Sequence, residues 1–422
     1  MSSILVETLK SLARGTISRH KPLVVAITGS LGKTSTREAI ACILQQKYKT
    51  RAAVKSFNTE LGIPLAIFGI KDYPGKNIFS WLKVFTQAIW QRFGLVTFPQ
   101  SLVLEMGIDK PGEMDRLLSL AQPDIGVLTG VGLSHAEFFE SLESLASEKG
   151  KLLKAVKPNG VAIYNSDNNA AAEIANKLRV KTISYGQAQG SDIRLLSLDE
   201  EFSSKPITKA VVSIDGTNME FSLKSIGHTH VYAALAAIAV AKFLKIESDL
   251  LAKGLEHIRP YPGRLNIIPG IKHTILIDDT YNAADPAGVY EALRVLEGFR
   301  NRQKLIVIGD MLELGAFSDK QHQEVGERIA ELNPILLVTV GDGGRVISRA
   351  AQSKGFPLSK VLNFDTSREA SKVVQEKLQP DWVVLLKGSQ GKRIEIITKE
   401  IMAEPMRANE LITRQYGKWL QS

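Results

Sequence analysis

The sequence predicts an α/β protein of two domains, each built on a mostly parallel β-sheet. Three observations support this. Short apolar, β-branched runs alternate with helical stretches from residue 23 onward, as in parallel sheets covered by helices. These runs fall into two series, separated by a segment with two prolines and a glycine at 259–266. The length of 422 residues suits two or three domains of ordinary size.

The chain is predicted to begin with a short amphipathic helix at residues 1–20. Apolar residues recur there at helical spacing, at Ile4, Leu5, Leu9, Leu12 and Ala13. The segment lacks the apolar core of a signal peptide, and no run approaches the roughly 18 apolar residues of a membrane span. The single Cys42 cannot form an internal disulfide. We therefore expect a soluble, cytoplasmic protein, and a monomer.

The first domain is expected at residues 21–262. It opens with a strand at 23–28, followed by a glycine-rich turn and a helix. Further buried strands are predicted at 102–107, 124–131 and 160–165. Residues 192–223 alternate over shorter segments around an Asp-Gly turn at 215–216, which predicts a hairpin attached to this domain.

The second domain is expected at residues 263–422, as a smaller, Rossmann-like doubly wound unit. Its strands are predicted at 274–279, 304–309, 335–341 and 382–387, with helical segments between them. Pro260, Pro262 and Gly263 mark a hinge between the domains.

The charge balance is mildly basic. Lys plus Arg number 53 and Asp plus Glu 44, a net charge of +9. This excess would suit an anionic substrate, an acidic membrane surface or a nucleic acid. No cluster of basic and aromatic residues of a recognised nucleic-acid-binding type accompanies it, so we expect no nucleic-acid partner.

A phosphate-binding loop follows the first strand. Residues 26–35, AITGSLGKTS, run from a strand into a helix, so backbone N–H groups and the helix N-terminus would face a phosphate. The strict P-loop pattern needs glycine at position 27, where the chain has isoleucine, so the loop is a near relative. The predicted ATP contacts in it are Thr28, Gly29, Ser30, Leu31, Gly32, Lys33, Thr34 and Ser35. Lys33 would pair with the phosphates, and the Thr34 hydroxyl would hold Mg²⁺.

This loop and several other segments resemble the Mur ligase family of ATP-dependent amide-forming enzymes. The matching segments are SFNTELGIP at 56–64, LEMG at 104–107, SEKGKLL at 147–153 and GHTHVYAAL at 227–235. The segments IDDTYNA at 277–283, GDMLELG at 309–315 and KGSQG at 387–391 most resemble the MurF branch, which adds D-alanyl-D-alanine to a UDP-muramyl tripeptide. In that branch an N-terminal domain holds the uridine nucleotide, whereas about twenty residues precede the first strand here.

The resemblance implies activation of a carboxylate by ATP, with one or two Mg²⁺ ions, followed by attack of an amine on the acyl phosphate. It assigns metal binding to Thr34, Glu105, His135 and Lys149, and catalysis to Lys33, Lys149, His135 and Arg264. It also implies a carbamate on Lys149, chosen over Lys151 by the family's spacing. From the residues alone, other roles remain open alternatives. Lys149 could be a solvated surface lysine, His135 an ordinary loop residue, and Arg264 a partner in a salt bridge at the hinge.

Further contacts are expected on both sides of the cleft. The remaining ATP contacts are predicted at Asn165, His230, Arg264, Asp279, Tyr281 and Asn282, and substrate contacts at Asn58, Thr59, Glu60, Asp310, Glu313, Lys387 and Ser389. Turn or helix capping is the alternative for these polar residues. Neither domain holds a complete site, so we expect the domains to close over ATP and substrate.

An insertion at about residues 72–101 separates the SFNTELGIP segment at 56–64 from the predicted strand at 102–107, which contains Glu105. Its helix, at 77–93, has a wide apolar surface and a narrow polar stripe. Packing on the first domain, docking on a partner protein and binding to a membrane surface are open alternatives. The basic residues nearby are Lys71, Lys76 and Arg92.

The function expected from these features is an ATP-dependent amide ligase of cell-wall precursor synthesis, acting on small-molecule nucleotide and peptide substrates. One alternative is a ligase of the same mechanism for another acid and amine. The other is a nucleotide-binding protein without ligase activity, against which intact Lys33, Glu105 and Lys149 argue.

Overall fold

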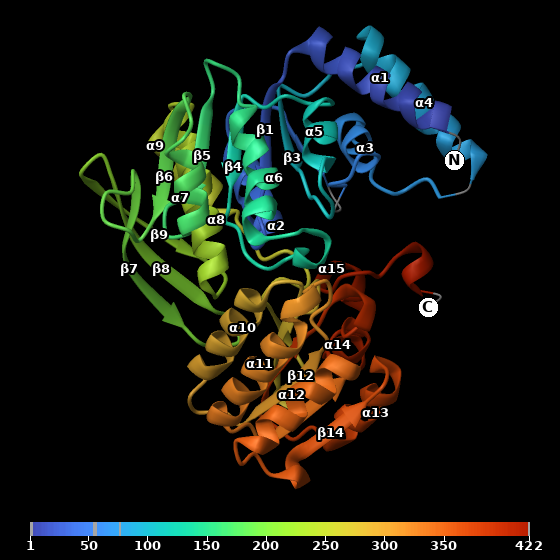
Figure 1. Cartoon of the computed structure of the whole chain (residues 1–422), viewed down its shortest axis with the longest axis vertical. Helices are drawn as coiled ribbons and strands as arrows, with labels where there is room; N and C mark the ends of the chain where they lie inside the picture. The colour runs from blue at the N-terminus through green and yellow to red at the C-terminus, as the bar shows by residue number, and fades with distance from the viewer. Residues whose placement is uncertain (1–2, 54–56, 76, 421–422) are drawn as a thin grey trace.

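The computed structural model describes residues 3–53, 57–75 and 77–420 as two lobes, each with its own β-sheet (Figure 1). Ser56 and Lys76 lie outside the described residues. In the described part of the chain, no helix has both the length and the apolar character needed to span a membrane.

The first sheet has nine strands in the order β2-β3-β1-β4-β5-β6-β7-β8-β9. The pairs from β2 to β7 are parallel, and β7, β8 and β9 form an antiparallel meander. Because β1 lies between β3 and β4, the loops after these strands meet at one edge of the sheet. The strands are β1 (Leu23–Thr28), β2 (Thr50–Ala52), β3 (Ser101–Glu105), β4 (Ile125–Leu128), β5 (Val161–Asn165), β6 (Lys181–Gly186), β7 (Ile193–Glu201), β8 (Ile207–Ile214) and β9 (Thr217–Leu223).

Helices cover both faces of this sheet. One face packs on α2 (Lys33–Leu44), α8 (His228–Phe243) and α9 (Ser248–Glu256). The other face packs on α1 (Ser3–His20), α3 (Gly62–Phe68), α4 (Ile78–Phe93), α5 (Glu113–Leu118), α6 (Leu142–Lys154) and α7 (Asn169–Ala175). Strands β1 and β3 to β6 are therefore covered on both sides, as near-continuous apolar strands require. In the meander β7 to β9, buried and exposed residues alternate.

The second sheet has six strands in the order β10-β11-β15-β12-β13-β14, and only β10 runs antiparallel to its neighbour. The strands are β10 (Asn266–Pro269), β11 (Ile275–Asp279), β12 (Lys304–Gly309), β13 (Leu336–Val340), β14 (Val361–Phe364) and β15 (Val383–Lys387). Helices α10 (Pro286–Gly298), α11 (Ser318–Leu332) and α12 (Asp342–Ser353) cover one face. Helices α13 (Ser367–Lys377), α14 (Glu395–Ile401) and α15 (Ala408–Leu411) cover the other.

The predicted α/β class, with two mostly parallel sheets, is confirmed. The Asp215–Gly216 turn joins β8 to β9 with φ angles of 51° and 80°, as the hairpin prediction requires. Strands β2, β10 and β14 were not predicted, because they are short or partly polar at the sheet margins. Strand β6, inside the first sheet, was not predicted either, because its sequence KTISYG mixes polar and apolar residues.

Candidate active site

A cavity of about 1350 Å³ lies between the two lobes, where the carboxyl ends of strands from both sheets meet. It brings together most of the predicted site residues. Those that line it are Ser30, Leu31, Gly32, Lys33, Thr34, Ser35, Asn58, Thr59, Glu105, His135, His230, Arg264, Asp279, Tyr281, Asn282, Glu313, Lys387 and Ser389. Residues distant in sequence therefore share one site, formed by both domains.

The phosphate loop joins β1 to α2 at one wall of the cavity. Gly29 and Gly32 have φ angles of 147° and 83°, and a Cβ at Gly29 would overlap the Thr129 hydroxyl. Both positions therefore favour glycine. The Lys33 ammonium donates a hydrogen bond to the Gly29 carbonyl at 2.7 Å, which curls the side chain back over the loop. The N-terminus of α2 opens into the cavity, an arrangement suited to an anion.

Two buried oxygen atoms lie beside this loop. The Thr34 hydroxyl donates to Glu105 Oε2 at 3.1 Å, and Arg37 Nη1 contacts the same carboxylate oxygen at 3.3 Å. All three side chains are buried. Thr34 lies in the first turn of α2 and Glu105 ends β3, so the parallel pairing of β1 with β3 brings them together.

Lys149 lies beneath the loop, outside the cavity lining. Its ammonium donates to Ser30 Oγ at 3.0 Å, and the residue is only 1% exposed. Burial, and then the positive charge of Lys33, hold the pKa of Lys149 well below its usual range. Lys151 instead forms ion pairs with Asp115 and Glu148 at 2.6 and 2.7 Å, away from the loop.

His135 and Glu313 connect the two domains across the cavity. His135 Nδ1 lies 2.7 Å from Glu313 Oε2 and 3.5 Å from Asp109 Oδ1. The imidazole lowers the pKa of the Glu313 carboxyl. The predicted metal ligand His135 is thus paired with a predicted substrate ligand, and both residues have left-handed φ angles, of 67° and 66°.

Lys387 and Asp279 form a buried ion pair at the ends of β15 and β11, with 2.5 Å between Nζ and Oδ2. Lys387 also donates to the carbonyl of Asn282 at 3.1 Å. Asp279 Oδ1 accepts from the backbone N–H of Leu265. Lys387, predicted on the substrate side, therefore contacts the segment predicted to bind the nucleotide.

Aromatic and cationic side chains line the wall beside this pair. The Arg264 guanidinium lies 4.1 Å from the centre of the Tyr281 ring, and Tyr261 meets the same ring edge-on. Burial raises the pKa of Tyr261 to about 12. His230 Nε2 and Arg264 Nε are buried without a hydrogen-bond partner in the described part of the chain. Unpaired buried polar atoms of this kind are expected where a ligand binds.

Several predicted residues lie outside the cavity lining. Asn165 bonds the Thr129 carbonyl and the Asp167 N–H, which matches the turn-capping alternative. Glu60 pairs with Lys10 and Arg116. Asp310 pairs with Lys392 and accepts from the Gly344 N–H. Thr28 and Gly29 are buried at the start of the phosphate loop and do not line the cavity. Their placement gives no support for direct ligand contacts.

Asp285, which the sequence analysis missed, reaches from the second domain to the segment 132–134 of the first, beside the phosphate loop. It caps α10 through the Ala287 N–H at 3.0 Å. Burial raises the pKa of its carboxyl, opposed in part by the charges of Lys149 and Lys33. Asp-Pro before a helical pattern marks a helix start, but this signal did not indicate the contact with the other domain.

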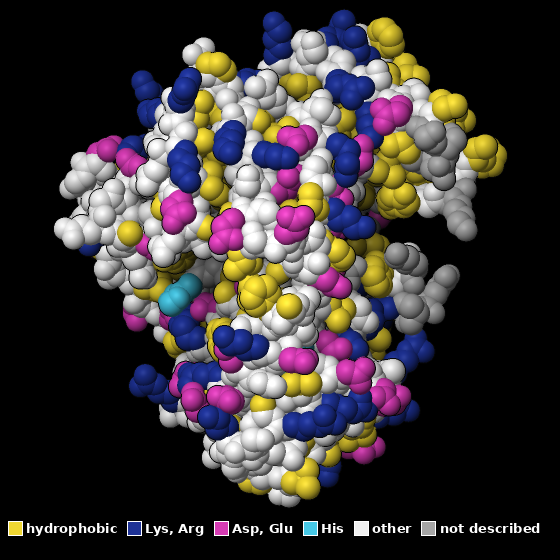
Figure 2. Space-filling view, in the orientation of Figure 1, with side chains coloured by type: hydrophobic (Ala, Val, Ile, Leu, Met, Phe, Trp, Pro, Cys, Tyr) yellow, Lys and Arg dark blue, Asp and Glu magenta, His cyan; other side chains and the backbone are white. Residues whose placement is uncertain are grey.

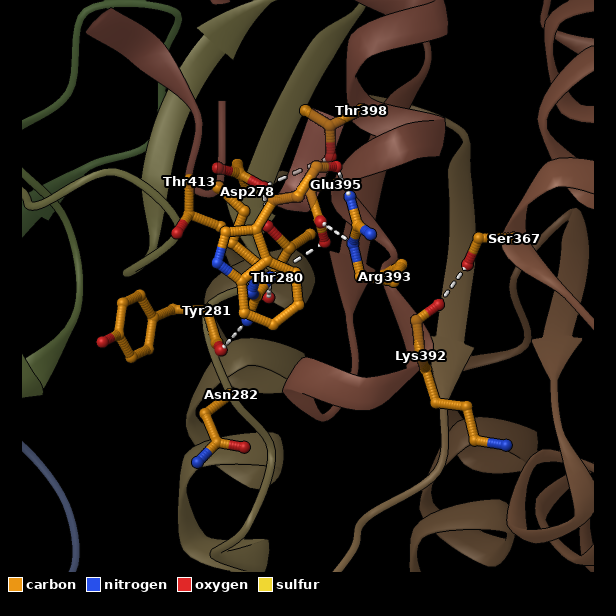
Figure 3. A network of polar contacts seen from close by, with 12 residues as sticks. Asp278, Thr280, Tyr281, Asn282, Ser367, Lys392, Arg393, Glu395, Thr398 and Thr413 are labelled. Carbon is orange, nitrogen blue, oxygen red and sulfur yellow. Dashed lines mark hydrogen bonds and ion pairs between the residues drawn. The ribbon is translucent and has the colours of Figure 1, made fainter. Parts of the chain in front are cut away.

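The C-terminal segment also contributes to the cavity, which the sequence analysis did not predict. Thr413, Tyr416, Gly417 and Trp419 line it. Arg414, itself buried, contacts Glu395 Oε2 at 2.8 Å and donates to the carbonyls of Thr280 and Tyr281. Figure 3 shows Glu395 also meeting Arg393, 2.6 Å away. This network ties residues 413–419, which we call the C-terminal strap, to the loop that carries Tyr281.

We expect Arg414→Ala to lower the free energy of unfolding by about 3–5 kcal/mol, because it leaves the buried Glu395 carboxylate without one of its two cations. The KM for ATP should rise as the Tyr281 loop loosens. Urea denaturation and initial rates test this. Arg407→Ala, an exposed arginine in the same tail, is the control. An unchanged KM for ATP in a folded Arg414→Ala protein would refute the role of the strap.

Asp278 is a buried carboxyl group beneath this network. Oδ1 accepts from Thr280 at 2.7 Å and Thr398 at 3.3 Å, whereas Oδ2 has no partner in the described residues (Figure 3). Burial, together with the charge of Asp279, raises the pKa of Asp278 to about 7. The folded state therefore binds this proton more tightly than the unfolded chain, so stability from this group falls as pH rises from about 4 to 7.

Asp278→Asn should remove that penalty and raise the unfolding free energy at pH 8 by roughly 2–4 kcal/mol, with little gain near pH 4. Thermal melts at both pH values measure the difference. An equal change at the two pH values would show that ionisation of Asp278 is not the cause.

Comparisons with known proteins agree with this site. The description "Mur ligase middle domain" matches residues 94–241, and "Mur ligase, glutamate ligase domain" matches residues 263–390. Together the two matches cover more than half of the chain.

Individual relatives extend the likeness to nearly the whole chain. The UDP-N-acetylmuramoyl-tripeptide--D-alanyl-D-alanine ligase of Bacillus subtilis is 28% identical over 399 residues, covering 94% of this chain and 80% of the relative. The protein of that name from Haemophilus influenzae is 29% identical over 392 residues, covering 92% and 78%.

Solved structures agree as well. MurF from Acinetobacter baumannii matches with a TM-score of 0.76 and 26% identity, over 95% of this chain and 80% of that one. MurF ligase from Thermotoga maritima in complex with ADP matches with a TM-score of 0.76 and 26% identity, over 94% and 83%. With both domains matched in sequence and fold, this chain belongs to the Mur ligase family.

Proposed function

We propose that this chain is an ADP-forming ligase that joins D-alanyl-D-alanine to a UDP-muramyl tripeptide, a step of peptidoglycan precursor synthesis. The observation that carries the proposal is the cavity itself. It joins a phosphate loop with Lys33 to the unpaired polar atoms of His230 and Arg264. The relatives of B. subtilis and H. influenzae bear the name of this activity.

In the proposed reaction, a carboxylate oxygen of the acceptor attacks the γ-phosphorus of ATP, and ADP leaves. The acyl phosphate is then attacked at its carbonyl carbon by the amine. The amide forms, the amine loses a proton, and phosphate leaves with the former carboxylate oxygen. Phosphoryl transfer depends mainly on positioning and countercharge, which Lys33 and the amides at the start of α2 supply.

Magnesium fits the oxygen atoms of Thr34 and Glu105. Mg²⁺ prefers oxygen ligands and usually keeps waters and substrate phosphates in its shell, so two protein oxygens 3.1 Å apart beside the loop are a suitable partial site. No cluster of three or more His, Cys, Asp or Glu side chains that could hold a metal occurs within the described ranges. A bound Mg²⁺ would neutralise charge on the phosphates.

We propose further that Lys149 is carbamylated in the active enzyme. Carbamate formation needs an unprotonated amine, and burial beside Lys33 favours that form at neutral pH. The neutral amine nitrogen bonds to the carbon of CO₂ and releases one proton, so an uncharged side chain becomes an anion. The new oxygen atoms would lie beneath the phosphate loop, near Ser30.

A panel of acceptors and amines tests the proposed substrates. Purified protein receives ATP, Mg²⁺, one acid and one amine, and the products are identified by mass spectrometry. We expect the amide of UDP-muramyl tripeptide with D-alanyl-D-alanine as the favoured product. Amide formation only with another acid or amine would preserve the ligase chemistry and refute this substrate pair. ATP binding without any amide product would refute the ligase function.

A further inference from the structure

We propose that the outer face of α1 and α4 is a docking surface for an anionic lipid bilayer. Figure 2 shows apolar side chains gathered over the two helices that Figure 1 labels α1 and α4. The residues that form this outer face are Ile4, Leu5, Ile78, Phe79, Leu82, Ile89, Trp90, Phe93, Leu95 and Val96, all of them exposed.

The exposure follows from the way α4 packs. Its inner side buries Trp81, Val84, Ala88 and Gln91, which recur at helical spacing against α1 and α3. The opposite side is apolar too, with Phe79 77% exposed, Trp90 50% and Phe93 60%. A helix with its inner side already packed needs no further large side chains for folding. These residues therefore leave an apolar surface of the kind that marks an interaction site.

The charges around this face favour an anionic partner. No Asp or Glu occurs between Tyr73 and Leu104. Arg14, Arg19 and Lys83 are exposed on or beside the two helices, and Arg92 lies over the Phe93 ring. The one acidic residue of α1 and α4, Glu7, is paired with Lys10 at 2.8 Å.

A bilayer satisfies this surface better than a protein does. Aromatic and aliphatic side chains flanked by Lys and Arg are typical of helices that lie in the interface of anionic membranes. A second copy of the chain, docked through the same face, would bring like charges of Arg14 and Lys83 together. A protein partner would be expected to meet a polar rim with hydrogen-bonding groups. In α4 every exposed residue except Lys83 is apolar, and the polar side chains of Ser80, Thr86, Gln87 and Arg92 are half-buried.

The docking surface is also connected to the cavity. Trp81, on the inner side of α4, donates from Nε1 to the Gly75 carbonyl at 3.0 Å and meets the Tyr73 ring edge-on. Asp72, Tyr73 and Gly75 line the cavity. A bilayer held by α4 would therefore lie close to one wall of the cavity, so membrane binding and substrate access are physically linked.

Vesicle flotation tests the proposal with the intact protein. One set of vesicles is phosphatidylcholine alone, and the other also contains phosphatidylglycerol. We expect wild-type protein to float with the anionic vesicles at least about tenfold more than with the neutral ones. The combined variant Leu82→Ser, Trp90→Ser and Phe93→Ser should lose about tenfold or more of that binding. Leu358→Ser with Met406→Ser, which removes exposed apolar residues of the other lobe, should leave it unchanged.

A second variant guards against misfolding of the first. Arg14→Glu with Lys83→Glu keeps every apolar residue and should lower binding to anionic vesicles about tenfold. ATP binding should be unchanged in each variant, because none of these residues lines the cavity. Wild-type protein that fails to float, or floats equally with both vesicles, overturns the proposal. So does a wild-type dimer by light scattering that the serine variant converts to monomer without any vesicle binding.

Discussion

Lys33→Ala is expected to lower kcat for ADP formation by roughly 10³-fold, with the protein still folded. The Lys33 ammonium is held over the phosphate loop by the Gly29 carbonyl. Burial lowers the pKa of Lys33, and the charges of Glu105, Asp285 and Asp109 oppose this effect only in part. A bound anion would further stabilise the buried cation. A preorganised donor aimed at charge that develops in the transition state commonly contributes about 10²–10³-fold. Steady-state rates with coupled ADP detection measure the loss.

The matched control is Lys151→Ala. Lys151 forms surface ion pairs with Asp115 and Glu148 rather than contacts with the loop, so its removal should change kcat less than twofold or so. Circular dichroism should show both variants folded. A Lys33→Ala enzyme with near-normal kcat would mean that the loop does not position the reacting phosphates.

Lys149→Ala and Lys149→Arg are both expected to lose about 10²-fold or more of kcat. Alanine removes the amine that would carry the carbamate. Arginine keeps a positive charge and a donor for Ser30 but forms no carbamate under these conditions. Equal losses of kcat in the two variants would therefore show that a positive charge at position 149 is not sufficient, as the carbamate requires.

Spectroscopy provides the direct control. Wild-type protein equilibrated with ¹³C-bicarbonate should give a carbamate carbon signal that both variants lack. The rate should also fall when CO₂ is removed from the buffer. A fully active Lys149→Arg enzyme would contradict the carbamate, and would instead assign Lys149 the role of a donor that fixes the Ser30 side of the loop.

Local patterns were enough to predict most of the fold. The strands that start at Leu23, Lys304 and Val383 are continuous apolar runs next to loops or helices, and such runs are the signature of buried parallel strands. The marginal strands β2 and β14 carry mixed polarity, because each lies at a sheet edge and is buried on fewer sides. Their pairing depends on neighbours distant in sequence.

The site was predictable where a residue follows a strand into a recognised segment. Thr34, Glu105 and Asp279 lie at such positions, and the sheets bring them into one cavity. Asp310 and Glu60 also fall in recognised segments, but their carboxylates form ion pairs within the chain, Asp310 with Lys392 and Glu60 with Lys10.

Long-range contacts explain what was missed. Asp285 reaches the segment 132–134, beside the phosphate loop, only because the domains meet there. Arg414 reaches Tyr281 only through the path of the chain after α15. Neither contact has a local sequence pattern. The exposed side of α4 was visible as an apolar surface, but its inner and outer sides were resolved only by the packing on α1 and α3.

The most direct test of the central claim follows one oxygen atom. The acceptor carboxylate of UDP-muramyl tripeptide is labelled with ¹⁸O, and the protein receives it with ATP, Mg²⁺ and D-alanyl-D-alanine. If the cavity makes an acyl phosphate, each released phosphate should carry one ¹⁸O, and its release should require both substrates. Unlabelled phosphate, released without formation of the amide, would show simple hydrolysis of ATP and contradict the proposed ligase mechanism.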